Sequence, residues 1–465
     1  MKIGRNARQG GFHLGAKINK KAFYNKDFSL ALMVKQYLPI QEAMNKGSGQ
    51  VQIRGWVHRE RGSNKLKFIV LRDSTNTIQC VFERAKFESR WADIDHLQVE
   101  SSLLISGEIK KDARAPTGYE IQVSDFTLVG KSENYPITKD QSIEFLADNR
   151  HLWLRSSKMI AILKIRSTVF AAIDEYFKSK GFYEYHSPIF QAVQCEGGSE
   201  LFEVKYFDKK DVFLSQSWQL YAEPAIFALE KIYTISPSFR AEKSKTSRHL
   251  TEYWHAEMEI AWADFKEIMD HGEALLKHIV QSVLDTNKLE LESLGRDIKK
   301  LEPIVKKPFL RMTYTDALKI LKDKCNMVVE WGKDLRTIEE EKLTQLYDVP
   351  IICTHYPKKV KAFYMTEDPT NPNVVQGCDF LAPEGYGEII GGSHREHDLE
   401  KIKKRLVEQG EDPLEYEFYL DTRRYGSVPH GGFGMGVERV IRWICGLESI
   451  KDAIAFPRTL ERYKP

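Results

Sequence analysis

Short runs in which apolar and polar residues alternate fill the chain between residues 51 and 130. Each run is rich in β-branched and aromatic residues and is bounded by Gly, Asn, Asp or Pro. The runs read VQIRGWVHRER, KFIVLRD, TIQCVF, SSLLISGEI and YEIQVSDFTLVG. Alternation with a period of two predicts strands that bury one face. Five such strands predict a small antiparallel barrel over residues 50–130, and the OB-fold is the commonest barrel of this size.

A longer region of mixed helices and strands follows the barrel. Residues 131–150 start with the polar, Pro-bearing stretch KSENYPITKD and are interpreted as a hinge. Residues 159–180 have apolar side chains at helical spacing and stop before Gly181, a favourable C-cap, so they predict one long helix. Strand-like segments then alternate with helices, and they read DVFLSQS, KIYTISPSFR, WHAEMEIAW, PIICTHY, KAFYM and YGEIIGG. We predict a second, α+β domain over residues 151–465, with the helix-rich, charged stretch 265–345 as an insertion that decorates it.

The composition excludes several classes of protein. Hydrophobic residues make up 42% of the 465 positions, which is ample for a large core and excludes a mainly disordered or fibrous chain. No apolar run approaches the roughly 18–20 residues that cross a bilayer, so we expect no membrane association. The six cysteines are scattered without a CxxC pair, which favours reduced thiols over a zinc site or a disulfide framework. These features predict a cytoplasmic protein.

The net charge of +3 hides an uneven distribution. Residues 1–49 hold nine Lys or Arg and two acidic residues, a local charge of +7, so the remainder carries −4. This basic N-terminal extension has no apolar segment of the kind found in secretory signals. An arm that contacts nucleic acid, a tether and an organellar targeting segment all stay open for it.

Two segments contain residue types that suit a nucleotide. In the first, Phe239-Arg240-Ala241-Glu242 is followed by the polar loop KSKTSRHLTEY, which offers cations for phosphate oxygens and an aromatic face for a base. In the second, a glycine-rich run, residues 431–436, allows close backbone approach and precedes an arginine in a helix. Each feature alone also fits a surface ion pair or tight packing. Gly130-Lys131-Ser132 is not part of a Walker A loop, because Asp125 replaces the required glycine.

In this order and separation, the segments resemble the three signature motifs of class II aminoacyl-tRNA synthetases. Gly181–Pro188 resembles motif 1, Phe239–Glu259 resembles motif 2, and Gly432–Arg439 resembles motif 3. The segments CEGGSELFEVKYF, SWQLYAE and LAPEGYGEIIGGSHRE are most similar to the aspartyl/asparaginyl branch of archaeal and eukaryotic type. The resemblance implies an OB-fold that binds the anticodon, joined to a class II core with an antiparallel sheet flanked by helices. It also implies a homodimer formed through motif 1.

Within this branch, the segment after Gln219 favours the asparaginyl enzymes. Aspartyl enzymes continue with a lysine that pairs with the substrate carboxylate, whereas this chain has Ala222 and Glu223. An ionised aspartate beside Glu223 would be repelled, while an asparagine amide could donate to Glu223 and accept from Arg395. Three alternatives stay open: an aspartyl enzyme, including one that also charges the asparagine tRNA, an asparagine synthetase built on the same core, and a nucleic-acid-binding or signalling protein with an inactive core. Glu223 also fits an ordinary acid on a helix face.

The resemblance implies two reactions. Asparagine attacks ATP to give asparaginyl-adenylate and pyrophosphate, and the aminoacyl group then passes to the 3′ end of tRNA(Asn). Positioning and charge neutralisation suffice for this chemistry, because the substrate carboxylate is itself the nucleophile. Arg240, Arg439 and Glu388 are the implied catalytic residues, and Mg²⁺ is implied at Asp379 and Glu388. Aspartyl enzymes often have Ser at the position of Gly391, so one ligand differs here.

The implied substrate contacts fall into two sets. The asparagine-binding residues, most of them polar groups for the ammonium, carboxylate and amide, are Glu196, Ser217, Gln219, Glu223, Arg240 and Arg395. The ATP-binding residues are Arg240, Glu242, Arg248, His249, Leu250, Tyr253, Glu388, Gly436 and Arg439. His249 is expected to contact phosphate, although a bystander or a general base also fits a single histidine.

Three residues of the barrel match anticodon-contacting positions of the family. Phe68 would stack on the central anticodon base, and Gln79 and Glu120 would read base edges. Phe68 lies in an alternating strand, so a role in the barrel core is the alternative.

Overall fold

The structure is a computed structural model that describes residues 37–195, 201–243 and 246–465. The chain divides into two compact units, Met1–Asp140 and Gln141–Pro465. Within the described ranges, each helix is too short or too polar to cross a membrane. The two units are treated separately below.

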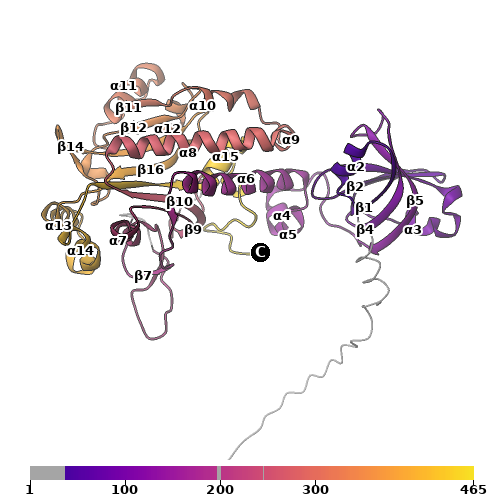
Figure 1. The fold of residues 1–465 in the computed structure, drawn as a ribbon, viewed down its shortest axis with the longest axis horizontal. Coiled ribbons are helices and arrows are strands. Elements are labelled where there is room, and N and C mark those ends of the chain that lie inside the picture. The colour runs from indigo at the N-terminus through magenta and orange to yellow at the C-terminus, as the bar shows by residue number, and fades with distance from the viewer. Residues whose placement is uncertain (1–36, 196–200, 244–245) are drawn as a thin grey trace, which may run out of the picture. The chain divides into compact units, whose positions relative to one another are not determined.

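The first unit is a closed five-stranded barrel in the order β1-β2-β3-β5-β4 (Figure 1). Its strands are β1 (Gly49–Gly62), β2 (Leu66–Arg72), β3 (Thr77–Glu83), β4 (Ser102–Lys111) and β5 (Tyr119–Gly130). All five predicted strands are present. The barrel is not wholly antiparallel as predicted, because β3 and β5 close it as a parallel pair. Between β3 and β4 lie η1 (Arg84–Lys86), η2 (Glu88–Arg90) and α3 (Trp91–Asp95).

The barrel unit starts before the predicted boundary at residue 49. Helix α2 (Ile40–Lys46) precedes β1 and ends at Gly47, whose φ of 75° is a left-handed cap. Ile40 and Ala43 are fully buried in the barrel core. The end of the predicted extension is therefore part of the barrel, and residues 1–36 lie outside the described residues.

The second unit is built on an eight-stranded sheet in the order β11-β12-β15-β16-β17-β10-β9-β6. The strands are β6 (Tyr183–Glu184), β9 (Lys231–Phe239), β10 (Glu252–Ala261), β11 (Leu310–Thr313), β12 (Ile351–Thr354), β15 (Gly377–Ala382), β16 (Gly387–His394) and β17 (His430–Gly436). The central pairs are antiparallel, and the edge pairs β11–β12 and β6–β9 are parallel. Two small ribbons accompany the sheet, β7 (Phe190–Gln191) with β8 (Phe213–Leu214), and β13 (Glu367–Asp368) with β14 (Asn371–Val375). The segment KAFYM, predicted as a strand, forms none.

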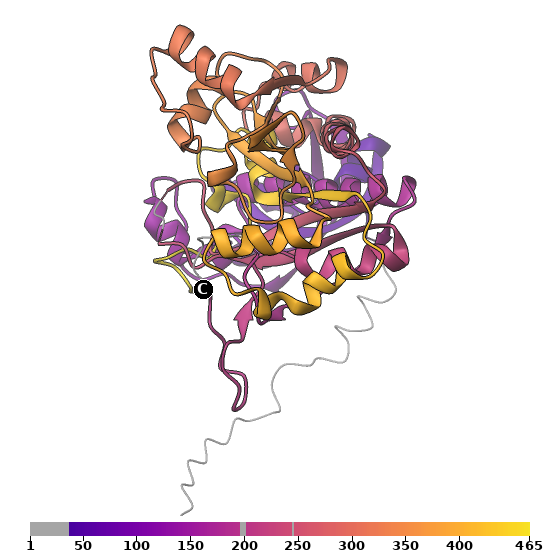
Figure 2. The same cartoon turned by 90° about the vertical axis from the view of Figure 1, so that its left-hand side faces the viewer.

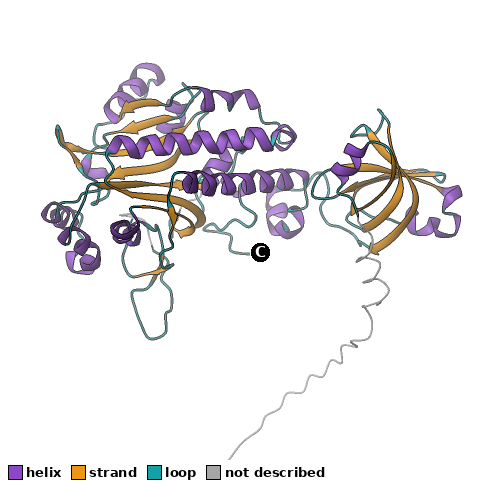
Figure 3. Ribbon diagram, in the orientation of Figure 1, coloured by secondary structure: helices purple, strands orange, loops and turns teal. Residues whose placement is uncertain are grey.

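Three helices pack with the sheet in one large apolar core (Figures 1 and 3). They are α6 (Ser157–Ser179), α8 (Phe265–Thr286) and α15 (Val437–Cys445). Helix α6 confirms the long helix predicted before Gly181. Helix α8 corrects the prediction of an insertion over 265–345, because Leu275 and Ile279 are fully buried against the sheet and β11 is one of its strands. A Cβ at Gly272 of α8 would lie 2.5 Å from the ring of Phe380 on β15, so helix and sheet are in close contact.

The predicted hinge, 131–150, is also shorter in the structure. Its second half contains α4 (Ile143–Asp148) and the start of α5 (Arg150–Trp153), which belong to the second unit. The Arg150 side chain is buried and donates to the carbonyls of Lys451, Ile454 and Ala455. These bonds fix the start of the second unit to its C-terminal segment.

Other helices complete the second unit. Helices α7 (Gln219–Leu229), α13 (Leu399–Glu408) and α14 (Glu417–Arg424) lie near one another, and Figure 2 shows α13 and α14 in yellow-orange in front. The remaining elements are α9 (Lys288–Ser293), α10 (Glu302–Lys306), α11 (Tyr314–Cys325), α12 (Thr337–Thr344), η3 (Ile298–Lys300), η4 (Lys358–Val360), η5 (Pro413–Tyr416) and η6 (Ile450–Asp452).

Candidate functional site

The side chains of β10 alternate between an apolar core and two cavities. Ala256 and Ile260 belong to the core shared with α6, α8 and α15. Glu257 and Glu259 project to the opposite face, where they line a cavity. Because successive side chains of a strand point to opposite faces, this single strand both anchors the sheet and supplies the floor of a polar site.

Neighbouring glycines leave the room that these polar side chains occupy. A Cβ at Gly434 of β17 would lie 2.4 Å from Nε2 of His255, and a Cβ at Gly432 would lie 2.3 Å from Glu259 Oε2. Tight packing, the alternative reading of the glycine-rich run, is therefore correct for Gly432. Gly434 also lines both cavities, so in this run packing and site construction coincide.

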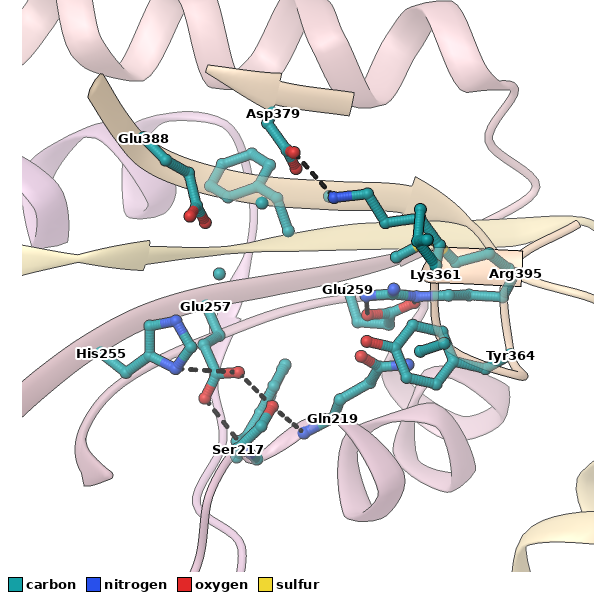
Figure 4. Close-up of a pocket in the computed structure, with 18 of the residues that line it drawn as sticks. Ser217, Gln219, His255, Glu257, Glu259, Lys361, Tyr364, Asp379, Glu388 and Arg395 are labelled. Carbon is teal, nitrogen blue, oxygen red and sulfur yellow. Dashed lines mark hydrogen bonds and ion pairs between the residues drawn. The ribbon is translucent and has the colours of Figure 1, made fainter. Parts of the chain in front are cut away.

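The larger cavity has a volume of about 620 Å³ and is mainly polar (Figure 4). Its lining includes Ser217, Gln219, Arg240, Glu257, Glu259, Lys361, Tyr364, Asp379, Glu388, Gly391 and Arg395. Six of these residues were predicted as site residues, namely Ser217, Gln219, Arg240, Asp379, Glu388 and Arg395. Glu196, also predicted for this site, lies outside the described residues.

Glu257 is a site residue that the motifs did not single out. Its carboxylate accepts from Ser217 Oγ at 2.5 Å and from the Trp218 backbone N–H at 3.0 Å. The backbone N–H of Gln219 donates to the same Ser217 oxygen at 3.2 Å. Burial raises the pKa of Glu257 to about 7, although its two hydrogen bonds favour the charged form. The group can therefore gain or lose a proton near neutral pH.

Arg395 faces the cavity and is held from behind by Glu259. Arg395 Nε and Nη2 donate to the two oxygens of Glu259, both at 2.9 Å, in a bidentate pair. The guanidinium also lies 5.1 Å from the ring centre of Tyr364. This geometry fixes Arg395 as a rigid donor at the cavity wall. Glu259 lies within the motif 2 stretch, but its partner is 136 residues away in sequence.

The structure corrects the position predicted for Glu223. The side chain is fully buried outside the cavity lining, and it accepts from Gln219 Nε2 at 2.9 Å and Tyr419 Oη at 2.8 Å. It also pairs with Arg423, and with His430 Nε2 at 2.9 Å. Although burial opposes ionisation, Arg423 holds the pKa of Glu223 well below its usual range. Glu223 therefore contacts the cavity lining through Gln219 and does not itself line the cavity, and a fully buried, ion-paired side chain also does not fit the alternative of an ordinary acid on a helix face.

Glu223, Glu259 and His430 have ligand atoms within 4.8 Å of one another, a spacing that would suit a metal. The carboxylates are instead neutralised by Arg423 and Arg395. This buried cluster is an ion-pair network.

Asp379 and Glu388 lie on either side of Gly391. A Cβ on this glycine would be 3.5 Å from Glu388 Oε1 and 3.7 Å from Asp379 Oδ1. Lys361 Nζ donates to Asp379 at 2.8 Å, and Arg439 Nη1 pairs with Glu388 at 3.0 Å. Burial raises the pKa of Asp379 despite Lys361, whereas Arg439 and Lys361 outweigh burial and lower that of Glu388. These two adjacent, partly buried carboxylates, with Asp379 15% and Glu388 36% exposed, form an oxygen donor set of the kind that suits Mg²⁺.

The second cavity is narrower, about 70 Å³, and adjoins the first through shared residues such as Arg240. Its lining contains all of the residues predicted to bind ATP, namely Arg240, Glu242, Arg248, His249, Leu250, Tyr253, Glu388, Gly436 and Arg439. Motif 2 residues from the loop between β9 and β10 and from β10 are thus brought together with motif 3 residues from β17 and the start of α15. The structure places the set in one pocket, while the role of each member stays a prediction.

The second cavity combines arginines, glutamates, histidines and one tyrosine ring. The Arg240 guanidinium lies 5.6 Å from the ring centre of Tyr253. His249 Nδ1 lies 2.5 Å from Thr246 Oγ1, and burial together with Arg439 lowers the pKa of His249. A neutral imidazole surrounded by arginines is a hydrogen-bond donor for an anion.

The predicted anticodon residues form one connected group on the barrel. The Arg61 guanidinium lies 5.4 Å from the Phe68 ring centre and donates to Gln79 Oε1 at 3.2 Å. Gln79 Nε2 in turn donates to Glu120 at 3.0 Å. Phe68 is half-buried and lies outside the barrel core cluster, so the core alternative is wrong for this side chain. Arg61 is an additional member of the group that motif comparison did not identify.

Comparisons with known proteins agree over both units. A family model described as tRNA synthetases class II (D, K and N) matches residues 142–460, and one described as an OB-fold nucleic acid binding domain matches residues 51–129. The asparagine–tRNA ligase of Thermococcus gammatolerans is 47% identical over 416 residues, which cover 90% of this chain and 96% of that protein. The asparagine–tRNA ligase of Thermoplasma acidophilum is 46% identical over 431 residues, covering 92% and 100%.

A solved structure is also similar. The crystal structure of asparaginyl-tRNA synthetase from Pyrococcus horikoshii complexed with asparaginyl-adenylate superimposes with a TM-score of 0.89 at 44% sequence identity. The match covers 92% of this chain and 100% of that one.

Proposed function

This chain belongs to the class II tRNA synthetases of the D, K and N group and, within it, to the asparagine–tRNA ligases, and from this membership we propose its two reactions. It activates asparagine with ATP to asparaginyl-adenylate and pyrophosphate, and it transfers the aminoacyl group to the 3′ end of tRNA(Asn). The observation that carries the proposal is the pair of adjoining cavities that share Arg240.

The shared wall suits the first reaction. ATP would occupy the narrow cavity, with its base at Tyr253 and its terminal phosphates near Arg248, His249 and Arg439. Asparagine would occupy the larger cavity, with its ammonium at Ser217 and Gln219. Arg240 then lies where the α-phosphate meets the substrate carboxylate, and it would neutralise charge that develops in the transition state. The reaction requires positioning of the two substrates and no side-chain nucleophile.

The charge balance behind the larger cavity favours asparagine over aspartate. The buried arginines Arg395 and Arg423 are balanced by Glu223 and Glu259. An added substrate carboxylate would be buried without a compensating cation, whereas a neutral carboxamide can accept from Arg395. Glu223 contributes through this balance and through its bond to Gln219, in place of the direct contact predicted from the sequence.

Asp379 and Glu388 would hold Mg²⁺, which when bound supplies positive charge to the phosphate oxygens of ATP. The donor set fits, because two partly buried carboxylates adjoin a glycine that leaves space beside both. Lys361 pairs with Asp379 and keeps one carboxylate oriented at this position.

Wild-type protein is expected to catalyse pyrophosphate exchange into ATP with asparagine and to discriminate against aspartate by about 100-fold or more in kcat/KM, because aspartate adds an unpaired buried charge. Exchange assays with the two amino acids in parallel measure this ratio. Exchange with aspartate alone would identify an aspartyl enzyme. Formation of free asparagine from aspartate, ammonia and ATP would identify an asparagine synthetase.

The barrel is proposed to bind the anticodon of tRNA(Asn). Replacing Phe68 by Ala or Leu removes the aromatic face, and should weaken tRNA binding by about 5- to 150-fold, since stacking contributes about 1–3 kcal/mol per base. Phe68→Tyr keeps the face and is the matched control. Filter binding or anisotropy with tRNA(Asn) measures the Kd, and exchange activity should be unchanged in all three variants. Wild-type tRNA affinity in the Leu variant would leave Phe68 without a role in stacking.

Three further features are proposals. Helix α6 and the segment Gly181–Pro188 would form the two-fold interface of a homodimer, and Tyr183 in this segment is 59% exposed in the single chain.

The basic extension would contact tRNA, with a tether or a targeting segment as alternatives. A truncation that tests this proposal should keep α2, which packs in the barrel. A cytoplasmic location is the third.

A further inference from the structure

The stretch predicted as a surface insertion places Asp334 in the lining of the larger cavity and brings Glu340 into contact with residues that line the narrow one. Helix α12 starts at Thr337 and has three consecutive glutamates, Glu339, Glu340 and Glu341, in and just after its first turn. A run of this kind is usually a solvated helix face. Here Glu339 caps its own helix by accepting from the Arg336 backbone N–H at 2.8 Å. In the preceding loop, Asp334 lines the larger cavity and lies 3.7 Å from Lys361.

The Glu340 side chain points away from its own helix and contacts two residues that line the narrow cavity. Its Oε2 accepts from Arg248 Nη2 at 2.7 Å and from the Glu388 backbone N–H at 3.1 Å. The side chains of Glu340 and Arg248 are 12% and 8% exposed, so the pair is shielded from solvent. One carboxylate oxygen therefore links a motif 2 arginine to the strand that presents Glu388, and both partners line the cavity.

The backbone is shaped to admit this contact. Gly387 has a φ of 72°, and a Cβ at this position would lie 2.1 Å from Arg248 Nη2 and 2.4 Å from Glu340 Oε2. The Arg248–Glu340 ion pair therefore occupies the space that a side chain at position 387 would need. A side chain there would be strained in the left-handed region and would also displace the pair.

Arg248 keeps a donor for a ligand while Glu340 holds it. Among the buried side-chain atoms of the described residues, Arg248 Nη1 has no hydrogen-bond partner. A buried guanidinium N–H in the wall of a cavity is costly unless an anion accepts from it. Burial and the nearby Glu388 raise the pKa of Glu340, so this carboxylate is also kept at an energetic cost. A buried ion pair that is kept at such a cost indicates that the site requires these two side chains in fixed positions.

We propose that Glu340 is a positioning residue for ATP, which fixes the Arg248 side chain and the Glu388 backbone so that both meet the triphosphate in one geometry. The proposal rests on the assignment of the narrow cavity to ATP. Glu340 acts through Arg248 and Glu388 and does not contact the nucleotide itself. Helix α12 then supports the nucleotide site through Glu340 and is not an insertion at the surface.

The experiment is asparagine-dependent pyrophosphate exchange with saturation curves for each substrate. Glu340→Ala should lower kcat/KM for ATP by about 10- to 100-fold, because a displaced phosphate donor costs this much in well-ordered sites. KM for asparagine should stay within about twofold. Glu340→Gln retains an oxygen that can accept both bonds and should recover most of the loss. The control is Glu341→Ala, which removes a neighbouring acid whose contact is with Gln345, and it should behave as wild type.

A double-mutant cycle separates positioning from general stability. Because part of the effect of Glu340 passes through Arg248, the loss in the double variant Arg248→Ala/Glu340→Ala should be clearly smaller than the product of the two single losses, and any loss beyond that of Arg248→Ala reports the contact with the Glu388 backbone. Equal losses for ATP and asparagine, additive losses in the cycle, or an unchanged Glu340→Ala enzyme would overturn the proposal. If the alanine variant does not fold, the Gln variant and the Arg248 single variant still decide it, because a positioning role requires a selective ATP effect in Arg248→Ala. Absence of exchange in the wild type would refute the proposed function instead.

Discussion

Replacing Arg240 by alanine is expected to lower asparagine-dependent pyrophosphate exchange by about 10³-fold in kcat, the largest loss in the molecule. Arg240 lines both cavities, and its guanidinium lies where the α-phosphate and the substrate carboxylate would meet. Removing one preorganised donor to developing charge costs about 10²–10³-fold, and a phosphate-clamping arginine contributes 10³-fold or more. Exchange kinetics with each substrate varied in turn measure kcat and both KM values.

Two variants serve as controls for the Arg240 prediction. Arg240→Lys keeps the charge but loses the planar fork, so we expect it to recover only part of the rate. Arg442→Ala removes a cation from α15 whose bonds go to the Glu448 carbonyl, outside both cavities, and should leave exchange within about twofold of wild type. A rate in Arg240→Ala close to wild type, with Arg442→Ala equally affected, would show that the shared wall is not the reaction centre.

The elements that could be predicted from sequence have strong local patterns. The five barrel strands alternate with a period of two, and α6 has a long apolar stripe that ends at Gly181, so neighbouring residues determine both. Helix α2 has only Ile40, Ala43 and Met44 as buried residues. Such a short helix offers no usable periodicity, and its association with the barrel depends on contacts that are distant in sequence.

The prediction that residues 265–345 form an insertion rested on their many charged residues. Helix α8 is amphipathic, and its charged residues face away from the sheet while Leu275, Leu276 and Ile279 are fully buried. The sequence shows the charges and the apolar residues equally, but it does not show that a sheet covers the apolar side. The same limit hid Glu340, because three consecutive glutamates look alike until their partners are placed.

In the candidate site, too, the residues with local sequence signals could be predicted, and their distant partners could not. Residues that match the family motifs, such as Arg240 and Arg439, were predicted as one set from the resemblance, and they line one cavity. The sequence predicts that Glu223 lies close to Gln219. It does not predict the direction of the Glu223 side chain, which points to Arg423. Glu257 and Glu259 had one local signal, acids that alternate with apolar residues in WHAEMEIAW. Their roles depend on partners from other segments, which only the fold brings together.

Glu257 is expected to control the binding of asparagine through its protonation. Its carboxylate is bonded to Ser217, the predicted ammonium ligand, so a bound ammonium would lie beside it. With a pKa of about 7, Glu257 is neutral below that pH and charged above it. In wild type, kcat/KM for asparagine should therefore fall by up to about tenfold per pH unit below pH 7 and level off above it. Glu257→Gln should lower kcat/KM for asparagine at pH 8 by about 10- to 150-fold, the equivalent of a lost charged hydrogen bond of about 1.5–3 kcal/mol.

The pH profile and the stability of the Gln variant distinguish this role from a structural one. The limb below pH 7 should vanish for asparagine in Glu257→Gln, while any limb for ATP persists, because Asp379, whose pKa is also raised, is unchanged. A carboxyl with a raised pKa stabilises the fold fully below its unfolded pKa, and this contribution is lost as pH rises through 7. The variant should therefore have a higher Tm than wild type at pH 8 and an equal one at pH 5. A limb that persists for asparagine in the variant, or a Tm that drops equally at both pH values, would remove Glu257 from substrate binding and leave it as a packing residue of β10.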